Sequence, residues 1–449
     1  MEIFIPSYAR TALNILRQGG FEGYIVGGCV RDSLLGKKPH DYDVCTDCPP
    51  EKMTELFKNF RTFATGLKHG TLTVIIEKNP VEITCYRSDG EYISHRKPAQ
   101  VKFETSLEED LKRRDFTVNA LAYSPEEGLV DLFGGREDLK NGVLRCVGEA
   151  EKRFDEDALR ILRGIRFSSC LGFRIEEKTS AAILKQRELL KSISAERIAE
   201  ELKKLLCGKD IRRVLSDYRD VIAVAIPELI PCFGFKQNNP HHFLDVYGHI
   251  CLSVENVRPD WVMRLTMLLH DIAKPDMHKV DDKGISHFKK HQFAGAEKAK
   301  EILRRLKIDN SSSGRIYDLI WEHDNRIPAT RKSVRRFIAQ HDFDFVMDYL
   351  EVRRADTYAQ SDYKRQEKLA ELDEIGRLAI DIKESQECIG LHDLAINGND
   401  VTAMGYKGKD IGLALEFALN GVLEEKAANE KEELKIYIEK NLGQEKSRY

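Results

Sequence analysis

Hydrophobic and polar positions change their spacing along this chain and divide it into a mixed N-terminal region and a helical remainder. Residues 71–77 (TLTVIIE) and 81–86 (VEITCY) alternate β-branched and polar side chains around Asn79 and Pro80, which predicts a β-hairpin. Residues 11–18 have the spacing of a helix that ends at a glycine pair. The first 140 residues are therefore predicted to form an α+β region.

From about residue 150 the apolar positions recur with the period of an α-helix. Residues 153–173 and 194–206 (SAERIAEELKKLL) both carry amphipathic stripes, and Ser194 is a candidate helix cap. Prolines mark a boundary near 226–240, and the SSSG run at 311–314 predicts a break between helices. The predicted division is a head at 1–140, a helical neck at 141–225, a helical domain at 226–330 and a helical tail at 331–449.

Composition limits the partners and the compartment. The 449 residues are 42% hydrophobic, which is enough for several cores. The net charge is −3, so a nucleic-acid partner would have to be held by local Arg and Lys clusters. Ten scattered cysteines, with Cys45 and Cys48 as the one close pair, fit free thiols in a reducing cytosol. No apolar run approaches the ~18 residues of a membrane span, so we expect a soluble cytoplasmic protein without a membrane partner.

The most informative stretch is residues 24–44 (YIVGGCVRDSLLGKKPHDYDV). A short apolar run meets a glycine pair, a helix-like segment containing Arg31 follows, and then Asp41 and Asp43 appear. In a strand these two carboxylates share one face, where they repel unless a cation lies between them. Hard oxygen ligands suit Mg²⁺, while glycine amides and Arg31 can hold a phosphate. The combination predicts metal-assisted nucleotidyl transfer, and the alternative is a glycine turn beside an acidic surface strand.

Further basic residues follow this stretch. Residues 84–103 are polar and are predicted to form a mobile loop. Residues 111–123 (LKRRDFTVNALAY) place charged residues before an apolar run, and residues 154–167 carry arginines at every third position. Spaced in this way, the arginines share a broad helical face. That face can be the solvent-exposed side of an amphipathic helix, and it can also contact a ligand.

These residues resemble the class II tRNA nucleotidyltransferases, that is, the CCA-adding enzymes and related bacterial poly(A) polymerases. The resemblance rests on GGCVRD, DYDV, YRSDGEYISHRKP, RRDFTVNA, DLFGG, EDALR and SAERIAEEL, which occur in the family's order over residues 20–210. It implies an α+β fold with a polymerase-β-like head followed by an all-α neck, body and tail. The loop departs slightly, with Ser94 and His95 where the family more often has an acidic pair.

The resemblance also implies roles for individual residues. Asp41 and Asp43 would be catalytic and hold Mg²⁺, and Glu82 is a candidate third carboxylate. Asp157 and Arg160 would read the base. An aspartate only accepts hydrogen bonds and an arginine only donates them, so the pair suits cytosine and adenine, while uracil and guanine present the reversed pattern. The other implied nucleotide-binding residues are Gly28, Arg31, Arg114, Arg163 and Arg166, the last two extending toward the phosphates.

A second cluster of His and Asp residues lies between residues 241 and 356. The HDIAK sequence resembles the HD phosphohydrolase superfamily, and that resemblance implies phosphatase or cyclic phosphodiesterase activity. Imidazole and carboxylate together suit a transition metal better than magnesium. The alternative is a degenerate domain that is kept as an RNA-binding body. The predicted ligands are His249, His270, Asp271, His291, His323 and Asp356.

The resulting functional prediction is a CCA-adding enzyme that uses CTP and ATP on tRNA. The alternatives are a poly(A) or A-only polymerase of the same class, an HD phosphohydrolase whose head only binds RNA, and a non-catalytic RNA-binding module. Residues 391–419 resemble the family's C-terminal tail, and their glycine-rich turn between helices is predicted to contact the RNA backbone.

Overall fold

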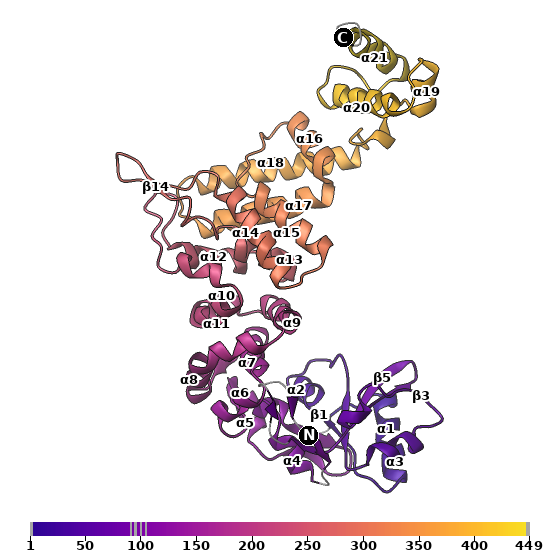
Figure 1. Cartoon of the computed structure of the whole chain (residues 1–449), viewed down its shortest axis with the longest axis vertical. Coiled ribbons are helices and arrows are strands. Elements are labelled where there is room, and N and C mark those ends of the chain that lie inside the picture. Colours follow the sequence, from indigo (N-terminus) through magenta and orange to yellow (C-terminus); the bar gives the residue numbers. More distant parts are fainter. Residues whose placement is uncertain (1–2, 90–91, 94–96, 99–100, 104–105, 446–449) are drawn as a thin grey trace. The chain divides into compact units, whose positions relative to one another are not determined.

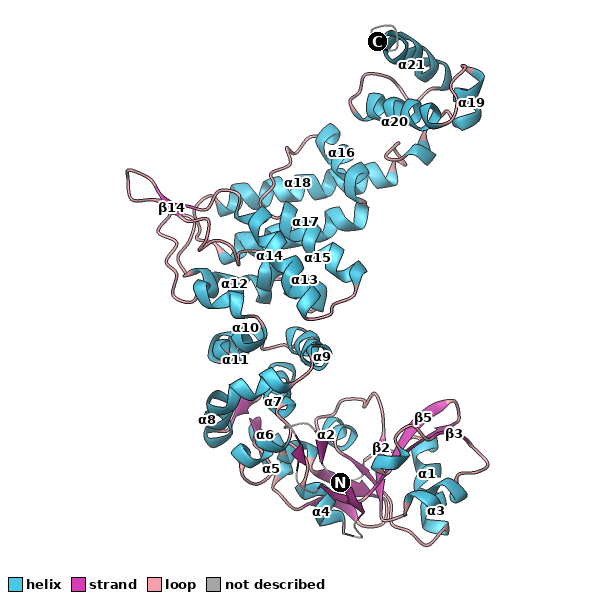
Figure 2. Cartoon of the chain, in the orientation of Figure 1, coloured by secondary structure: helices cyan, strands magenta, loops and turns pink. Residues whose placement is uncertain are grey.

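The computed structural model describes residues 3–89, 92–93, 97–98, 101–103 and 106–445 (Figure 1). The chain forms two compact units. Unit 1 comprises Met1–Ile230 with Arg304–Ile308, and unit 2 comprises Pro231–Leu303 with Asp309–Tyr449. The α+β architecture is confirmed, because strands of one large sheet lie in unit 1 and the rest of the chain is mainly helical (Figure 2). The finer division into head, neck, body and tail stays a prediction.

Unit 1 is built on a seven-stranded sheet with the order β11-β10-β1-β2-β5-β4-β3. Its neighbouring strands are antiparallel, except that β2 and β5 run parallel. That parallel pair lies in the middle of the sheet, and β2 begins at one of the predicted catalytic carboxylates. The strands are β1 (Tyr24–Val26), β2 (Asp43–Thr46), β3 (Arg61–Phe63), β4 (Thr71–Ile76), β5 (Asn79–Cys85), β10 (Leu121–Ser124) and β11 (Gly128–Asp131).

The predicted hairpin is confirmed as β4 and β5, but its turn lies earlier than Asn79 and Pro80. Ile76 pairs with Asn79, so the two-residue turn is Glu77 and Lys78, with φ of 51° and 66°. Positive φ at both central residues matches the right-handed twist of paired strands. The alternation of apolar residues located the strands, whereas turn chemistry favoured the wrong pair because Asn and Pro are common in turns.

Helices cover the sheet on its buried side. The helix predicted at residues 11–18 is confirmed as α1 (Ser7–Gln18), which begins earlier, directly after Pro6. It contacts β2, β4 and β5, while α2 (Gly28–Leu34) contacts β1 and β10. Buried side chains of α1, among them Leu13 and Leu16, join the core. The central strands of the sheet, β2 among them, are thereby packed against helices.

The segment predicted as a loop contains paired backbone. β6 (Arg87–Asp89) pairs with β9 (Val101–Phe103), and β7 (Tyr92–Ile93) pairs with β8 (Lys97–Pro98). These strands are too short to give a period-2 signal in the sequence. Ser94 and His95, where the chain departs from the family's pattern, lie outside the described residues.

Short helices complete unit 1, and α7 packs closely against α9. Ser194 does precede α9, as predicted, but its side chain makes no capping hydrogen bond. α7 and α9 each have buried apolar residues, and the two helices pack against each other. The helices are α3 (Pro50–Leu56), α4 (Leu107–Lys112), α5 (Gly135–Asn141), α6 (Ala150–Glu156), α7 (Leu159–Leu171), α8 (Glu177–Gln186), α9 (Ala195–Leu206), α10 (Ile211–Asp217) and α11 (Arg219–Ala225).

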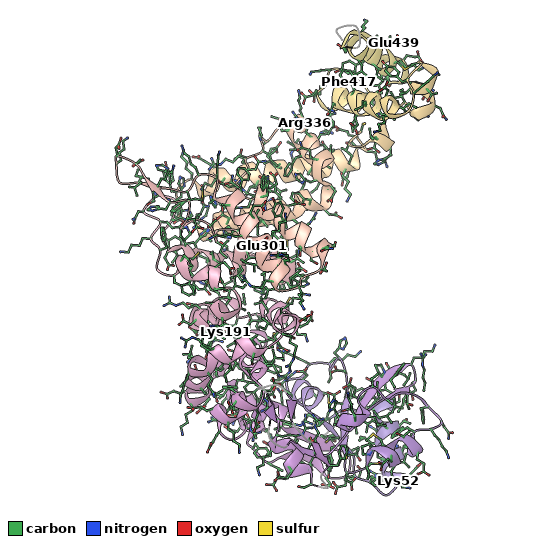
Figure 3. The ribbon with its side chains drawn as sticks, viewed as in Figure 1. Lys52, Lys191, Glu301, Arg336, Phe417 and Glu439 are labelled. Carbon is green, nitrogen blue, oxygen red and sulfur yellow. The ribbon has the colours of Figure 1, made fainter. Side chains whose placement is uncertain are left out.

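Unit 2 is a helical body with many buried apolar side chains, and Figure 3 draws the described side chains of the whole chain as sticks. The predicted break at 311–314 is wrong. Asp309 caps α15 by accepting a hydrogen bond from the Ser312 amide at 2.9 Å, so the serines form the first helical turn. The helices are α12 (Val246–Glu255), α13 (Trp261–Leu269), α14 (His291–Arg305), α15 (Asn310–Glu322), α16 (Arg331–His341), α17 (Phe343–Ala359), α18 (Arg365–Glu384), α19 (Gly398–Ala403), α20 (Lys409–Leu423) and α21 (Lys431–Glu445).

The last helices have a core of their own, which includes Val401, Ala414 and Leu434. The glycine-rich turn predicted in this region lies between α19 and α20, where Gly405 and Gly408 have φ of +95° and +56°. Within the described residues, no helix is both long and apolar enough to span a membrane.

Candidate functional site

A tight turn joins β1 to α2 at the first candidate site. Gly27 has φ +79° and ψ −123°, and a Cβ there would meet Nη1 of Arg114 at 3.2 Å. Glycine is therefore required both by the backbone angle and by the close approach of a guanidinium. The Gly27 amide donates to the Leu121 carbonyl at 3.0 Å, so this donor is already used. The predicted phosphate contacts consequently rest on Gly28 and Arg31.

The carboxylates lie where β2 begins. Asp43 is the first residue of the strand, and Asp41 precedes the strand rather than belonging to it. Both are exposed while Tyr42 between them is 5% exposed, which fits the predicted shared face of the two aspartates. The parallel register with β5 sets Glu82 opposite Asp43. Three acidic side chains thus lie near one another where the central strand β2 begins.

Electrostatic strain is concentrated on Asp43. The pKa of its carboxyl is raised to about 6, mainly because surrounding protein displaces its water and further because Asp41 and Glu82 are negatively charged. Arg114 acts in the opposite direction but does not compensate. A carboxylate held in this way favours a bound cation.

Buried ion pairs fix the arginines near these carboxylates. Arg113 and Arg114 share the buried carboxylate of Asp110, at 2.7 and 3.0 Å. Asp115 is buried too, and its Oδ2 accepts a hydrogen bond from Nε of Arg163 at 2.8 Å. Burial alone would raise the pKa of Asp115, but Arg163, the Asn119 side chain and Arg160 together outweigh it and the pKa falls to about 2. These pairs orient the guanidinium groups before any ligand arrives.

Helix α7 supplies the next set of residues. Arg160 is anchored by its terminal nitrogens, which donate to the carboxylate of Glu156 at 2.6 Å and to the carbonyls of Arg153 and Arg113 at 3.0 and 2.8 Å. Six residues further on, the guanidinium of Arg166 lies 3.9 Å from the centre of the neighbouring Phe167 ring. Asp157, just before the helix, accepts a hydrogen bond from the Leu159 amide at 3.1 Å.

One cavity of about 500 Å³ brings these groups together. All seven predicted nucleotide-binding residues line it, and so does Asp43, whereas Asp41 does not. Eight arginines face only three carboxylates there, so the cavity is strongly cationic. The lining residues are Gly27, Gly28, Arg31, Asp43, Arg87, Arg113, Arg114, Asp115, Asn119, Asp157, Leu159, Arg160, Arg163, Arg166, Phe167 and Arg197.

Several of these residues were missed in the sequence. Arg87 falls in the segment that was interpreted as a loop, and Asn119 accepts a hydrogen bond from Arg31 at 2.7 Å although 88 residues separate them. Phe167 was assigned only to the apolar stripe. Arg197 lies in the SAERIAEEL helix, for which the sequence pattern predicts only an apolar stripe. No spacing rule links these positions, because the fold alone brings them together.

Unit 2 holds the second candidate site, which unites all six predicted ligands from five different places in the helical body. Nε2 of His249 lies 2.9 Å from Asp356 and 3.2 Å from Oδ2 of Asp271. On the other side of Asp271, Oδ1 lies 3.1 Å from Nε2 of His291 and 3.8 Å from that of His323. Two sets of ligands with atoms within 4.8 Å of one another therefore share Asp271: His249, His270, Asp271 and Asp356 in one, and Asp271, His291 and His323 in the other.

The histidine rings are oriented by the backbone. Nδ1 of His270, His291 and His323 lies 2.7, 2.8 and 2.6 Å from a carbonyl three residues earlier, and Nδ1 of His249 lies 3.2 Å from the Ala359 carbonyl. A carbonyl only accepts, so each Nδ1 carries a proton, and in the neutral imidazole, the form that binds a metal, each Nε2 presents a lone pair. These lone pairs face each other at 3.3 and 3.1 Å, which repels unless a cation lies between them.

A cavity of about 370 Å³ opens onto this centre and carries further cations, including Arg326 and Lys368. Lys274 is buried and reaches Asp271 at 2.7 Å. In the described part of the chain, the two sets around Asp271 are the groups of three or more potential ligands that meet this closely. The head carboxylates Asp41 and Asp43 do not form such a group with Glu82.

Three family profiles match successive segments of the chain. A family profile described as "Poly A polymerase head domain" matches residues 23–145. The profile "Probable RNA and SrmB-binding site of polymerase A" matches 172–229, and a "tRNA nucleotidyltransferase domain 2" profile matches 291–437.

Relatives match over most of the chain. The CCA-adding enzyme of Streptococcus thermophilus (strain CNRZ 1066) is 32% identical over 97% of this chain and 98% of its own length. That of Lactobacillus helveticus (strain DPC 4571) is 39% identical over 71% of this chain and 75% of its own. The crystal structure of the Bacillus stearothermophilus CCA-adding enzyme in complex with CTP superposes with a TM-score of 0.72 at 29% identity, covering 99% of this chain and 100% of that one.

Proposed function

The chain belongs to the class II CCA-adding enzymes, and we propose that it adds C, C and A to the 3′ end of tRNA from CTP and ATP. The observation that carries the proposal is the cavity of unit 1, which unites a carboxylate of the DYDV motif with all seven predicted nucleotide-binding residues. The eight arginines outnumber the three carboxylates of that cavity, so its positive charge complements the negative charge of a nucleoside triphosphate.

We assign Asp41 and Asp43 as the residues that hold Mg²⁺, with Glu82 as a third carboxylate. The raised pKa of Asp43 supports this assignment, because a cation would offset the repulsion among the three acids. When bound, Mg²⁺ would supply Lewis-acid activation of the RNA 3′-OH and charge neutralisation on the departing pyrophosphate. The arginines orient the triphosphate, and Asp157 with Arg160 reads the base edge.

The experiment is single-nucleotide extension of a tRNA that lacks its 3′ CCA. CTP alone should add two residues, ATP should then add one, and GTP and UTP should incorporate poorly. Long A tails on arbitrary RNA would favour the poly(A) polymerase alternative. Addition of A only to a tRNA that already ends in CC would favour the A-only alternative. The cytoplasmic location stays a prediction.

A second candidate function is metal-dependent phosphohydrolysis in unit 2. It is favoured by the paired Nε2 lone pairs and by the two sets of ligands that share Asp271, an arrangement suited to two transition-metal ions. His249, His270 and Asp356 would hold one ion and His291 with His323 the other, and Asp271 belongs to both sets of potential ligands. Bound metal would activate a water molecule, and Lys274 and Arg326 would orient an anionic phosphoester.

Metal content by mass spectrometry and hydrolysis of 2′,3′-cyclic and terminal phosphates across several divalent metals would test the second function. A protein that binds no transition metal at this site and cleaves none of these substrates would instead support a degenerate, RNA-binding body.

A further inference from the structure

A further cavity of unit 1, the Phe4 cavity, has no role in the proposed function. It has a volume of about 710 Å³, within the range of roughly 300–1,000 Å³ that small-ligand sites have. Its walls come from the segment that leads into α1, from the end of α2 with the loop that leads to β2, and from the first residue of β5. All of these belong to unit 1, so the cavity is a property of that unit alone.

The DYDV stretch lies between the Phe4 cavity and the nucleotide cavity. Asp43 lines the nucleotide cavity, whereas His40 and Tyr42, which flank Asp41, line the Phe4 cavity. The pKa of Tyr8, another lining residue, is raised by burial and further by the negative charge of Asp41, so that carboxylate is within electrostatic reach of the cavity. A group bound in the Phe4 cavity is therefore close to the predicted metal ligands but outside the space predicted for the triphosphate.

An exposed aromatic ring lies at the wall of this cavity. Phe4 is 77% exposed, while Ile3 and Ile5 on either side of it are buried and hold the segment against unit 1. The Tyr42 hydroxyl donates a hydrogen bond to the Phe4 carbonyl at 3.4 Å, which also fixes the backbone. Leaving a large ring in water costs hydrophobic free energy, so a flat ligand that covers it would be bound.

Positive charge lies beside this ring. Lys37 and Lys38 line the cavity and are exposed, and neither ammonium group forms an ion pair with a described residue. His40 adds an imidazole, and no described residue of the lining is an Asp or a Glu. Single-stranded RNA has the matching chemistry, because its bases stack on aromatic side chains and its phosphates bind cationic ones.

We propose that the Phe4 cavity holds the 3′-terminal nucleotides of the RNA acceptor, with a base stacked on Phe4 and backbone phosphates bound by Lys37 and Lys38. The RNA 3′-OH must reach the metal that Asp41 and Asp43 would hold while the triphosphate fills the nucleotide cavity. From the Phe4 cavity an RNA strand can approach these carboxylates without displacing the triphosphate. The inference rests on the proposed nucleotidyl transfer and gives its second substrate a place.

The test measures addition of C to a tRNA that lacks its 3′ CCA, by the intact wild type and by variants of exposed wall residues. Phe4→Leu keeps an apolar side chain but removes the ring, and Phe4→Trp restores a ring. Lys37→Gln combined with Lys38→Gln removes both charges. The matched controls are Phe63→Leu and Lys52→Gln, since both residues are exposed in unit 1 and lie outside the lining of its two cavities.

We expect Phe4→Leu to raise the KM for tRNA about 5- to 150-fold, the range for stacking of one base on an aromatic ring, and Phe4→Trp to restore it. An abasic residue at one of the last two RNA positions should impair the wild type by a similar factor and Phe4→Leu much less. The lysine double variant should reduce the salt dependence of log kcat/KM for tRNA by about 1.4, because each single-strand phosphate contact contributes about 0.7. The KM for CTP should stay unchanged throughout.

Three results would overturn the proposal. One is an unchanged kcat/KM for tRNA in both Phe4→Leu and the lysine double variant. Another is an equal rise of the KM for tRNA and for CTP, which would indicate a general disturbance of unit 1. The third is an abasic residue that impairs the wild type and Phe4→Leu equally. A wild type that adds neither C nor A to any tRNA would instead refute the proposed function.

Discussion

Replacing Asp43 by Asn should abolish nucleotide addition and yet stabilise unit 1 in the absence of metal. The pKa of Asp43 rises from 3.8 to about 6. At 1.36 kcal/mol per pH unit, that shift costs the folded state at most about 3 kcal/mol above pH 6. The side chain is exposed, so solvent screening reduces the expected gain of the variant to about 1 kcal/mol.

The sign of the pH dependence follows from the direction of the shift. The pKa of Asp43 is higher in the folded chain than in the unfolded one, so the folded chain binds the extra proton between pH 4 and pH 6. Its contribution is therefore destabilising: absent below the unfolded pKa near 4, growing as pH rises, and complete above pH 6. The advantage of Asp43→Asn should vanish at pH 4 and reach its full size by pH 7.

Hydrogen exchange followed by mass spectrometry suits the measurement, with peptides that cover β1, β2 and β5. Tryptophan fluorescence would report the wrong region, since Trp261 and Trp321 are the two tryptophans of the chain and both lie in unit 2. Asp220→Asn, on an exposed helix position of unit 1, is the control. An Asp43→Asn protein that is less stable than the wild type at pH 7, or a stability difference independent of pH, would refute the electrostatic reasoning. Saturating Mg²⁺ should reverse the order, because only the wild type gains a ligand.

Three further outcomes are expected. Asp41→Ala should abolish addition without unfolding the chain, and near-wild-type extension of truncated tRNA with Mg²⁺ would contradict its assignment. Asp157→Ala and Arg160→Ala should each lower the ratio of kcat/KM for CTP over UTP, as measured by single-turnover addition; equal slowing of all four nucleotides would make the pair structural. His270→Ala combined with Asp271→Ala should spare nucleotide addition but remove transition-metal binding, so loss of both properties together would contradict the separation of the two sites.

The sequence predicted the elements of the head well where a local rule applied. The alternation over residues 71–86 located the hairpin because each strand has one buried face. The parallel pairing that sets Glu82 beside Asp43 was not predictable in this way, since β2 and β5 are separated by two other strands in the chain. Glu82 was singled out only through family resemblance, and its register supports that choice.

The sequence-based prediction was wrong or incomplete where the structural role of a polar residue could not be inferred from local composition. The run at 311–314 looked like a break because serine and glycine are common in loops, but Asp309 turns it into the start of a helix. Arg197 was overlooked for a related reason. Its helix was interpreted from the apolar stripe alone, and an arginine in a first turn resembles an ordinary solvated residue until α7 is packed beside it.

The two candidate sites differ in a way that explains which was easier to find. The head carboxylates are exposed and spread around a cavity, and their charges remain partly uncompensated, as the raised pKa of Asp43 indicates. Such a site suits a hard cation that enters and leaves with a triphosphate. In unit 2 the imidazoles are buried and their rings are fixed by backbone carbonyls, which favours a cation that stays in place. A short motif is enough to predict the first kind of site. The second kind requires ligands from helices far apart in the sequence. The sequence therefore predicted which residues are ligands, but not that Asp271 belongs to both sets.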